Sequence, residues 1–216
     1  MASVDPQEPS AELLIAAYVR GIFPMVDPRT REVEWFSPDP RAIFPLDGFH
    51  VPRRLARTVR ARRFEIRTNS AFEAVMRECA VLRARRPQTW IDERLISAYV
   101  DLHRRGAAHS IEAWRAGDLV GGMYGVHLGG AFFGESMFSR PERGGTDASK
   151  VCLVHLVQML RQHGFTLLDT QLSNPHLEQF NCLEIPRADY LVLLQRALRR
   201  PARWPSGQLL SAAKRA

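Results

Sequence analysis

Three consecutive segments decide the fold: "AAHSIEAWR" (107–115), "LVGGMYGVHL" (119–128) and "AFFGESMFS" (131–139). Each is rich in aliphatic and aromatic side chains, and the short connections between them read "AGD" and "GG". Strand-forming residues separated by such turns are typical of β-hairpins. The stretch therefore predicts a three-stranded antiparallel meander.

Regular elements flank this meander on both sides. Before it, "FEIRT" (64–68) alternates like a strand, and Asn69 is placed to cap a helix over 70–80 that a second helix over 92–105 follows. After it we expect a helix over 146–163, a strand over 165–171 and helices near 174–180 and 187–199. This order resembles the acyltransferase fold of the N-acetyltransferases (GNAT type), an α+β fold with a mixed sheet and flanking helices. Fold alone does not fix function.

The first fifty residues differ in character from the rest. "PSAELLIAAYVRG" (9–21) predicts a short amphipathic helix with Ser10 as its N-cap and Gly21 as its stop signal. Proline-rich segments follow it, around one strand-like stretch, "VEWFS". We therefore expect a small N-terminal α/β domain over 1–49 and an acyltransferase-like domain over 50–216, which opens with a basic helix over 52–63.

Composition limits the class of protein. With 216 residues, 45% of them hydrophobic, the chain can bury a core of ordinary size. It has no apolar run of the roughly 20 residues that span a bilayer and no signal peptide, so we expect a cytoplasmic protein without membrane contact. Cys79, Cys152 and Cys182 lie far apart, and the histidines form no metal-ligand motif. We expect no disulfide framework and no metal site.

Positive charge is concentrated in one region. Residues 50–86 hold eleven Arg against three Glu, a local excess of +8 in a chain whose net charge is +7. On the expected helix, Arg53, Arg57 and Arg60 share one face. Arginine suits phosphate because its planar fork donates two hydrogen bonds at once. An Arg-rich composition or an ordinary solvated face would give the same pattern, but its one-sidedness favours contact with a nucleic acid.

Glu135 lies in an otherwise apolar stretch, "AFFGESMFSR" (131–140). A carboxylate in such surroundings is costly unless a cation meets it. One interpretation places Glu135 on the solvent face of a strand, and another places it on the floor of a pocket for a positive ligand. This stretch alone favours the first. The glycines of "GGMYG" (121–125) lie within a strand, where glycine indicates close approach of a ligand or of another backbone.

Over roughly residues 10–195 the chain resembles the leucyl/phenylalanyl-tRNA–protein transferases of bacteria. The segments that carry the resemblance, in order, are "YVRGIFPM", "SPDPRAIF", "TWID", the meander from "GAAHSIEAW" to "GESMFSR", "ASK" and "LLDTQLSNPHLEQF…CLEIPR". The resemblance implies an enzyme that moves Leu or Phe, and Met less readily, from charged tRNA onto an N-terminal Arg or Lys. The modified protein would then enter the N-degron pathway of proteolysis. It also implies a small N-terminal domain joined to an acyltransferase-like domain.

The resemblance assigns the acceptor site to Glu135, Asp169 and Gln171. Glu135 would match the cation of the acceptor residue, and Asp169 with Gln171 would hold its α-amine for peptide-bond formation. An ordinary pKa near 4 would make Asp169 a weak general base, so orienting the amine is the alternative role. Without the resemblance, "LLDTQ" (167–171) would be interpreted as a strand leaving the core.

The resemblance also implies an apolar pocket for the side chain of the donor. Its lining falls on Met123, Phe132, Met137, Leu156 and Leu168, each of which could equally be ordinary core. Trp90 of "TWID" would stack on the terminal adenosine of the tRNA. Relatives carry tryptophan where this chain has Met25, so stacking there would be weaker or supplied by Trp35 or Phe36.

Direct aminolysis of the aminoacyl ester needs neither a metal nor a cofactor, and we expect a monomer. Two rival functions remain. An acetyl-CoA-dependent acetyltransferase needs a pyrophosphate loop of the form (Q/R)xxGx(G/A), but "RPERGG" (140–145) has Arg143 where the first glycine belongs. A non-catalytic RNA-binding protein would use the arginine face alone.

Overall fold

The computed structural model describes residues 5–82, 88–207 and 209–211 of the chain. Within these residues the strands form one two-stranded and one eight-stranded sheet, with the order β10-β4-β5-β6-β7-β8-β3-β9 in the larger one. The strands are β1 (Phe23–Val26), β2 (Val33–Phe36), β3 (Arg41–Phe44), β4 (Glu65–Thr68), β5 (Ala108–Arg115), β6 (Asp118–Leu128), β7 (Ala131–Ser139), β8 (Leu167–Gln171), β9 (Leu183–Ile185) and β10 (Leu209–Ser211).

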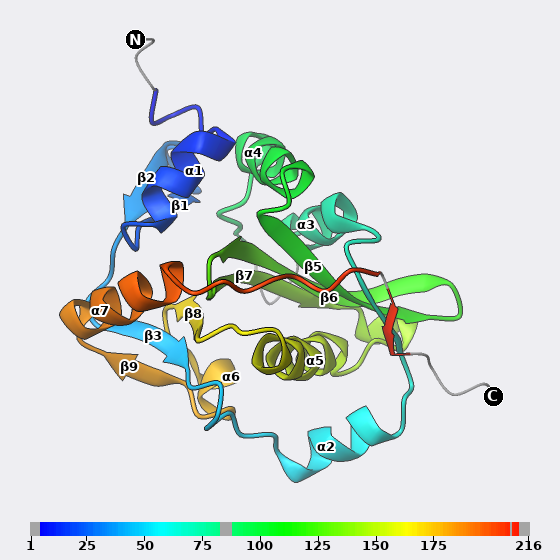
Figure 1. Ribbon diagram of the computed structural model, residues 1–216. Coiled ribbons are helices and arrows are strands. Elements are labelled where there is room, and N and C mark those ends of the chain that lie inside the picture. The colour runs from blue at the N-terminus through cyan, green and yellow to red at the C-terminus, as the bar shows by residue number, and fades with distance from the viewer. Residues whose placement is uncertain (1–4, 83–87, 208, 212–216) are drawn as a thin grey trace.

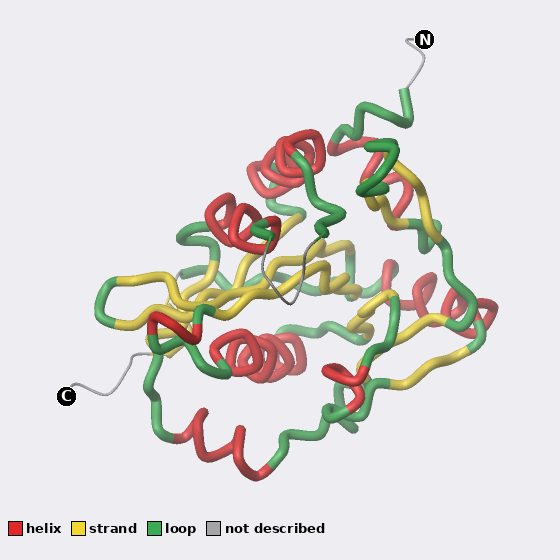
Figure 2. Tube along the Cα trace, turned by 180° about the vertical axis from the view of Figure 1, so that it is seen from behind, coloured by secondary structure: helices red, strands yellow, loops and turns green. Residues whose placement is uncertain are grey.

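Helices cover both faces of the large sheet (Figure 1). They are α1 (Ala11–Tyr18), α2 (Arg53–Arg60), α3 (Phe72–Ala80), α4 (Glu93–Arg104), α5 (Ala148–Gln162), α6 (Pro175–Glu178) and α7 (Arg187–Leu198), with a 3-10 turn, η1 (Pro141–Arg143). Helices α3 and α4 lie on one face of the meander and α5 lies on the other, as the view from behind also shows (Figure 2). The buried apolar side chains accordingly form two clusters, one on each side of the sheet.

The predicted meander is confirmed. β5, β6 and β7 pair antiparallel in sequence order, and α5 then carries the chain across to β8, which pairs parallel to β7. Two glycines of β6 are explained by close packing. A Cβ on Gly121 would lie 2.4 Å from the Cβ of Ala148 on α5, and one on Gly125 would lie 2.2 Å from the carbonyl oxygen of Phe133. The mixed sheet with flanking helices confirms the α+β class.

The N-terminal lobe consists of α1 and the β1–β2 hairpin, and the chain then enters the large sheet. β3 pairs antiparallel with β8 on one side and with β9 on the other. It therefore belongs by chain position to the expected small domain (1–49) and by hydrogen bonding to the large sheet. The division of the chain at residue 49 into separate domains stays a prediction.

The predicted role of Asn69 as a helix cap is wrong. α3 begins at Phe72, and Asn69 adopts a left-handed backbone conformation with φ +58°. Its side-chain oxygen accepts a hydrogen bond from the backbone N–H of Ser110 on β5. The N-terminus of α3 instead meets the buried carboxylate of Glu112, which accepts from the backbone N–H of Ala71 at 2.8 Å. A partner on a distant strand, rather than a local cap, starts this helix.

The segment after α7 crosses the sheet to reach β10, which pairs with β4 at the sheet edge (Figure 1). Trp204 in this segment stacks on the ring of His109, with centroids 4.1 Å apart, and donates a hydrogen bond to the hydroxyl of Thr68. Burial, together with the neighbouring His127 and His103, lowers the pKa of His109 to about 3. His109 is therefore neutral in the folded protein at physiological pH.

We predict that acid destabilises the fold partly through His109. Below its unfolded pKa of 6.5 the unfolded chain binds a proton that the folded chain excludes until about pH 3, so stability falls as pH falls through this window. Between pH 6.5 and 5 the loss is about 2 kcal/mol at most. The free energy of unfolding of His109→Gln, measured by denaturant titration, should depend less on pH than that of the unmodified chain. The exposed His50→Gln should leave the dependence unchanged, and equal slopes in all three proteins would contradict the prediction.

Candidate active site

A β-bulge on β7 directs Glu135 into a cavity. On β6 the neighbours Tyr124 and Gly125 pair with Ser136 and Gly134, so Glu135 is an extra residue without a partner on β6. A bulge bends its strand and re-aims a side chain. Gly125 permits the bulge, because a Cβ there would collide with the carbonyl oxygen of Phe133. The sequence stretch alone favoured the solvent face for Glu135, but the structure shows it lining a pocket.

Side chains from three other elements surround the Glu135 carboxylate. The side-chain amide of Gln171 on β8 donates to it at 2.9 Å, and the hydroxyl of Tyr99 on α4 donates at 3.4 Å. The hydroxyl of Tyr18 on α1 lies 2.5 Å from that of Tyr99. Burial raises the pKa of the Glu135 carboxyl to about 8. The surroundings therefore weaken the preference of this carboxyl for its charged form.

Asp169 lies behind the cavity, in a buried ion pair with Arg41 of β3. The guanidinium donates to both carboxylate oxygens, from Nε at 3.0 Å and from Nη2 at 2.7 Å. Tyr190 donates a third hydrogen bond at 2.6 Å, and the backbone N–H of Gln171 donates a fourth at 2.8 Å. Both Asp169 and Arg41 have exposures of 0%.

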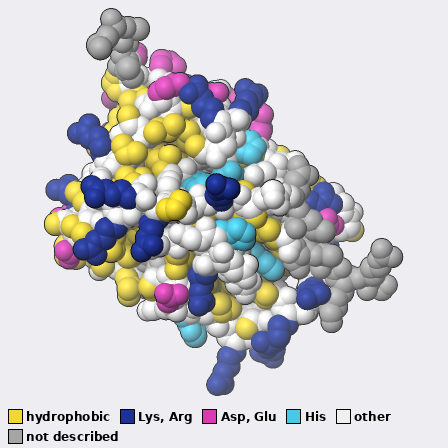
Figure 3. Space-filling view, in the orientation of Figure 1, with side chains coloured by type: hydrophobic (Ala, Val, Ile, Leu, Met, Phe, Trp, Pro, Cys, Tyr) yellow, Lys and Arg dark blue, Asp and Glu magenta, His cyan; other side chains and the backbone are white. Residues whose placement is uncertain are grey.

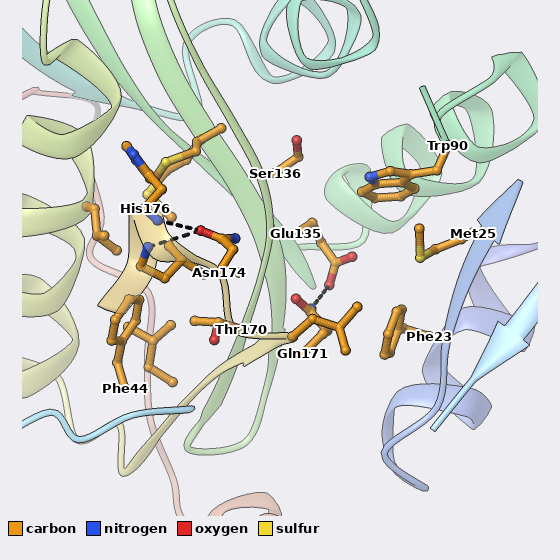
Figure 4. A pocket seen from close by; sticks show the side chains of 17 residues that line it. Phe23, Met25, Phe44, Trp90, Glu135, Ser136, Thr170, Gln171, Asn174 and His176 are labelled. Atoms are coloured by element: carbon orange, nitrogen blue, oxygen red, sulfur yellow. Dashed lines mark hydrogen bonds between the residues drawn. The ribbon is translucent and has the colours of Figure 1, made fainter. Parts of the chain in front are cut away.

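This ion pair fixes the backbone that presents Gln171. On β3, Ala42 pairs with Gln171 of β8, and the next residue, Ile43, pairs with Asp169. Thr170, between these two residues of β8, has no partner on β3 and forms a second bulge. Gln171 adopts φ +61°, which is unusual for a residue other than glycine. Its N–H bond to Asp169 stabilises this conformation and turns the side chain toward Glu135 (Figure 4).

The cavity of about 330 Å³ lies between the diverging strands β7 and β8 and the N-terminal lobe. The parallel pairing of these two strands ends at Phe133 and Asp169, and the residues beyond separate. Figure 4 shows Glu135 and Gln171 in the middle of the cavity, Met25, Phe23 and Trp90 on one side, and Phe44, Asn174 and His176 on the other. A carboxylate and an amide thus face an otherwise largely apolar space.

The structure brings most of the predicted site residues to this cavity. Those that line it are Met25, Trp90, Met123, Glu135, Met137, Leu168 and Gln171. Asp169 reaches it only through Gln171. Phe132 and Leu156, predicted for the donor pocket, have exposures of 1% and 0% and pack in the apolar cluster that α5 forms with the sheet. Phe132 contacts Trp204 and Phe165 there rather than the cavity.

A second cavity, of about 310 Å³, adjoins the first and shares Met25 and Trp90 with it. Its lining includes Phe36 but not Trp35. The β1–β2 register explains this difference, because Phe36 pairs with Phe23 while Trp35 pairs with Pro24 on the opposite face of the hairpin. Of the two aromatic side chains considered as substitutes for the tryptophan missing at Met25, Phe36 lines one of these two cavities and Trp35 lines neither.

The arginines of α2 lie on the surface. Arg53, Arg57 and Arg60 are exposed, and none of them forms an ion pair with another described residue, whereas Arg54 lies 3.7 Å from Asp147. Figure 3 shows basic side chains gathered over α2, and others over α7. The positive region 50–86 extends over residues 83–86, which lie outside the described residues.

Several site residues were not singled out from the sequence. Arg41 lies within "SPDPRAIF", and Phe23 lies within "YVRGIFPM". Asn174 and His176 lie within "SNPHLEQF" and line the cavity. Their segments were recognised for the resemblance, but only the pairing of β3 with β8 reveals that Arg41 meets Asp169.

The described residues contain no group of three or more His, Cys, Asp or Glu side chains placed to hold a metal ion. Within the same part of the chain, no helix is long and apolar enough to cross a membrane. Neither finding changes the interpretation of the cavity, whose chemistry depends on Glu135 and Gln171.

Two family models match the chain. The description "Leucyl/phenylalanyl-tRNA protein transferase" fits residues 43–195, and its N-terminal domain fits residues 7–39. The chain belongs to the leucyl/phenylalanyl-tRNA protein transferase family. The resemblance seen in the sequence is thereby confirmed, and the protein is an aminoacyltransferase rather than an acetyltransferase.

Relatives with the name leucyl/phenylalanyl-tRNA–protein transferase are similar over most of their length. The relative from Gloeobacter violaceus is 52% identical over 89% of this chain and 96% of its own length. The relative from Paramagnetospirillum magneticum is 54% identical over 88% of this chain and 89% of its own length. The relative from Salinibacter ruber is 52% identical over 93% of this chain and 85% of its own length. The match to the solved structure of L-PGS from Bacillus licheniformis covers 76% of this chain and 51% of the L-PGS chain, at 14% sequence identity. Its TM-score of 0.38 is too low to support an argument.

We predict that the Arg41–Asp169 pair stabilises the fold only as a pair. Arg41→Met would leave a buried carboxylate uncompensated and should cost about 3–5 kcal/mol of unfolding free energy. The double variant Arg41→Met, Asp169→Leu should recover part of this loss, since it removes both charges. Denaturant titration measures both effects.

Arg77→Met is the matched control, because Arg77 pairs with Glu73 and Glu93 on the surface. Exposed ion pairs contribute about 0–1 kcal/mol. An Arg41→Met variant no less stable than Arg77→Met would contradict the prediction.

Proposed function

We propose that the protein transfers Leu or Phe, and Met less readily, from charged tRNA to the N-terminal Arg or Lys of a protein, which marks that protein for N-degron proteolysis. The observation that carries the proposal is the Glu135–Gln171 pair in a largely apolar cavity of a member of this family. The apolar lining suits the side chain of the donor. The carboxylate suits the acceptor residue, whose α-amine and side chain both carry positive charge.

In this proposal the donor occupies both cavities. Its side chain contacts Met123, Met137 and Leu168, and its terminal adenosine lies in the second cavity against Trp90 and Phe36. Methionine side chains repack readily, so the pocket accepts several apolar shapes. Aromatic stacking on a base is worth about 1–3 kcal/mol. Met25, at the boundary of the two cavities, separates the adenosine from the amino acid.

The acceptor residue lies against Glu135 and Gln171, and Asp169 acts on it indirectly. Because Asp169 is enclosed by Arg41, Tyr190 and the Gln171 backbone, it serves as a positioning residue that holds Gln171. The aminoacyl ester is already activated, so the enzyme has to position the two substrates and allow the amine to lose its proton. Transfer is a direct aminolysis.

We further propose that the protein acts in the cytoplasm, where charged tRNA is available, and that it acts as a monomer. One chain supplies every residue named for the two cavities. No membrane is involved in the reaction.

The experiment that tests this function pairs donors and acceptors separately. Purified protein should transfer radiolabelled Leu, Phe and, more slowly, Met from tRNA to a peptide that begins with Arg or Lys, and should leave acetyl-CoA unused. β-Branched Val and Ile should be poor donors, because their shape differs close to the carbonyl. Binding of tRNA without transfer would instead favour a non-catalytic RNA-binding protein, and acetylation of the peptide would favour an acetyltransferase.

We predict that α2 binds tRNA through phosphates. If Arg53, Arg57 and Arg60 each neutralise one phosphate of a single strand, the slope of log affinity against log salt should become less steep by about 2 in the triple alanine variant. The KM for charged tRNA should rise, while kcat at saturating donor should change little. Filter binding at several salt concentrations measures the slope.

The matched control removes three exposed arginines from α7 and its C-terminal end, Arg196, Arg199 and Arg200. An equal change of slope in the control would attribute the effect to total charge rather than to α2. An unchanged slope in the α2 variant would reject the assignment.

A further inference from the structure

Aminolysis requires a proton to leave the acceptor amine, and this inference, which rests on the proposed function, concerns the group that takes it. A free α-amine has a pKa of about 7.7–8.0, so most of it is protonated at neutral pH and cannot attack an ester. Either the amine arrives already deprotonated or a group in the cavity accepts its proton.

Asp169 is not placed to accept the proton of the acceptor amine. It has an exposure of 0%, and its two carboxylate oxygens accept four hydrogen bonds, two of them from Arg41. A base must come within hydrogen-bond reach of the proton it takes. Asp169 does not line the cavity, whereas Gln171, two residues further along β8, does. A proton on Asp169 would also break the buried ion pair, whose loss is strongly unfavourable.

Gln171 has the position but not the chemistry. Its side-chain nitrogen donates to Glu135, which leaves its carbonyl oxygen to accept a hydrogen bond from the acceptor amine. A neutral amide does not hold a proton in water near neutral pH. Gln171 can therefore orient the amine but cannot store its proton.

Glu135 has both. It is the sole carboxylate among the described residues that line the cavity. Its oxygens accept hydrogen bonds from Gln171 and Tyr99, and the carboxylate lines the cavity where the amine would bind. His176, the other titratable residue of the lining, lies beyond Asn174 at the far side of the cavity (Figure 4).

We propose that Glu135 is the general base of the transfer: it pairs with the α-ammonium of the acceptor and takes a proton from it. The neutral nitrogen then forms a bond to the ester carbonyl carbon, and the bond from that carbon to the 3′ oxygen of the tRNA breaks. The second proton of the nitrogen passes to the departing 3′ oxygen. The first proton leaves Glu135 for solvent when the product departs.

The surroundings of Glu135 support this role. Burial raises the pKa of its carboxyl to about 8, with Asp169 adding to the increase, while Arg41 and the hydroxyls of Tyr18 and Tyr99 oppose it. Tyr190 on α7 is a further titratable group within electrostatic range. A general base works best when its pKa lies close to the pH at which the enzyme operates. The raised pKa brings the carboxyl closer to the amine from which it takes the proton.

The rival role for Glu135 is a pure anchor for the guanidinium of the acceptor side chain. The two roles give opposite pH trends for Glu135→Gln. If Glu135 is the base, the active pair is carboxylate with ammonium. The ratio of unmodified to variant kcat/KM is then flat below pH 7.7. Above pH 8 this ratio falls by about tenfold per unit, because the amine arrives deprotonated and needs no base. If Glu135 is an anchor, the guanidinium stays charged, and the ratio rises with pH until the carboxyl is fully ionised.

The test measures single-turnover transfer of Leu from tRNA to an Arg-start peptide between pH 6.5 and 9.5. At pH 7 the loss in Glu135→Gln should be about 100-fold or more, within the usual range for general-base catalysis. Above pH 8 the loss should shrink. A ratio that grows with pH would overturn the proposal.

A second acceptor keeps the test independent of how much of the variant is folded. An α-aminooxy analogue of the Arg-start peptide keeps the guanidinium, but its nitrogen is unprotonated at neutral pH. With this peptide Glu135→Gln should lose less than about tenfold at pH 7, because no ammonium has to be neutralised. Equal losses with both peptides would establish the anchor role instead.

Glu184→Gln on β9 is the control for loss of one carboxylate, since Glu184 is exposed and lies outside both cavities. It should transfer at the unmodified rate throughout. If the unmodified protein transfers nothing to either peptide, the proposed function fails. If it transfers normally and the loss in Glu135→Gln follows the anchor trend, only this inference fails.

Discussion

The buried ion pair between Arg41 and Asp169 is the contact on which the site depends. Arg41 donates to Asp169 and to the carbonyl oxygen of Gly21, and its guanidinium lies 4.9 Å from the ring centre of Phe23 and 4.6 Å from that of Tyr190. One charged side chain thus joins the N-terminal lobe, the central sheet and α7. A buried charge needs every one of its partners, so these elements have to meet in one arrangement.

That arrangement positions two polar side chains of the cavity, Glu135 and Gln171, through irregular backbone. A bulge at Glu135 on β7 and another at Thr170 on β8 end the regular pairing of the two strands. The strands separate at the point where a carboxylate and an amide face each other across the resulting cavity. The site is therefore a local departure from the sheet, held by the regular sheet around it.

In our proposal the cavity divides the work of catalysis among few groups. Apolar side chains suit the amino acid of the donor, and the aromatic side chains of Trp90 and Phe36 offer stacking surfaces. Gln171 orients, Glu135 exchanges a proton in our proposal, and Asp169 stabilises the conformation of Gln171 from behind. Because the ester is activated before it binds, such positioning and one well-placed base are sufficient for aminolysis.

The sequence by itself determined the local features and the family. Alternating strands, short turns and glycine stops gave the meander and most helices, and a run of specific segments gave the enzyme class. Only the tertiary structure decided the direction of Glu135, the partner of Asp169 and the start of α3 near Asn69. The physical reason is that each depends on groups far apart in the chain: a clash that only glycine at 125 avoids, an arginine 128 residues away, and a carboxylate on β5.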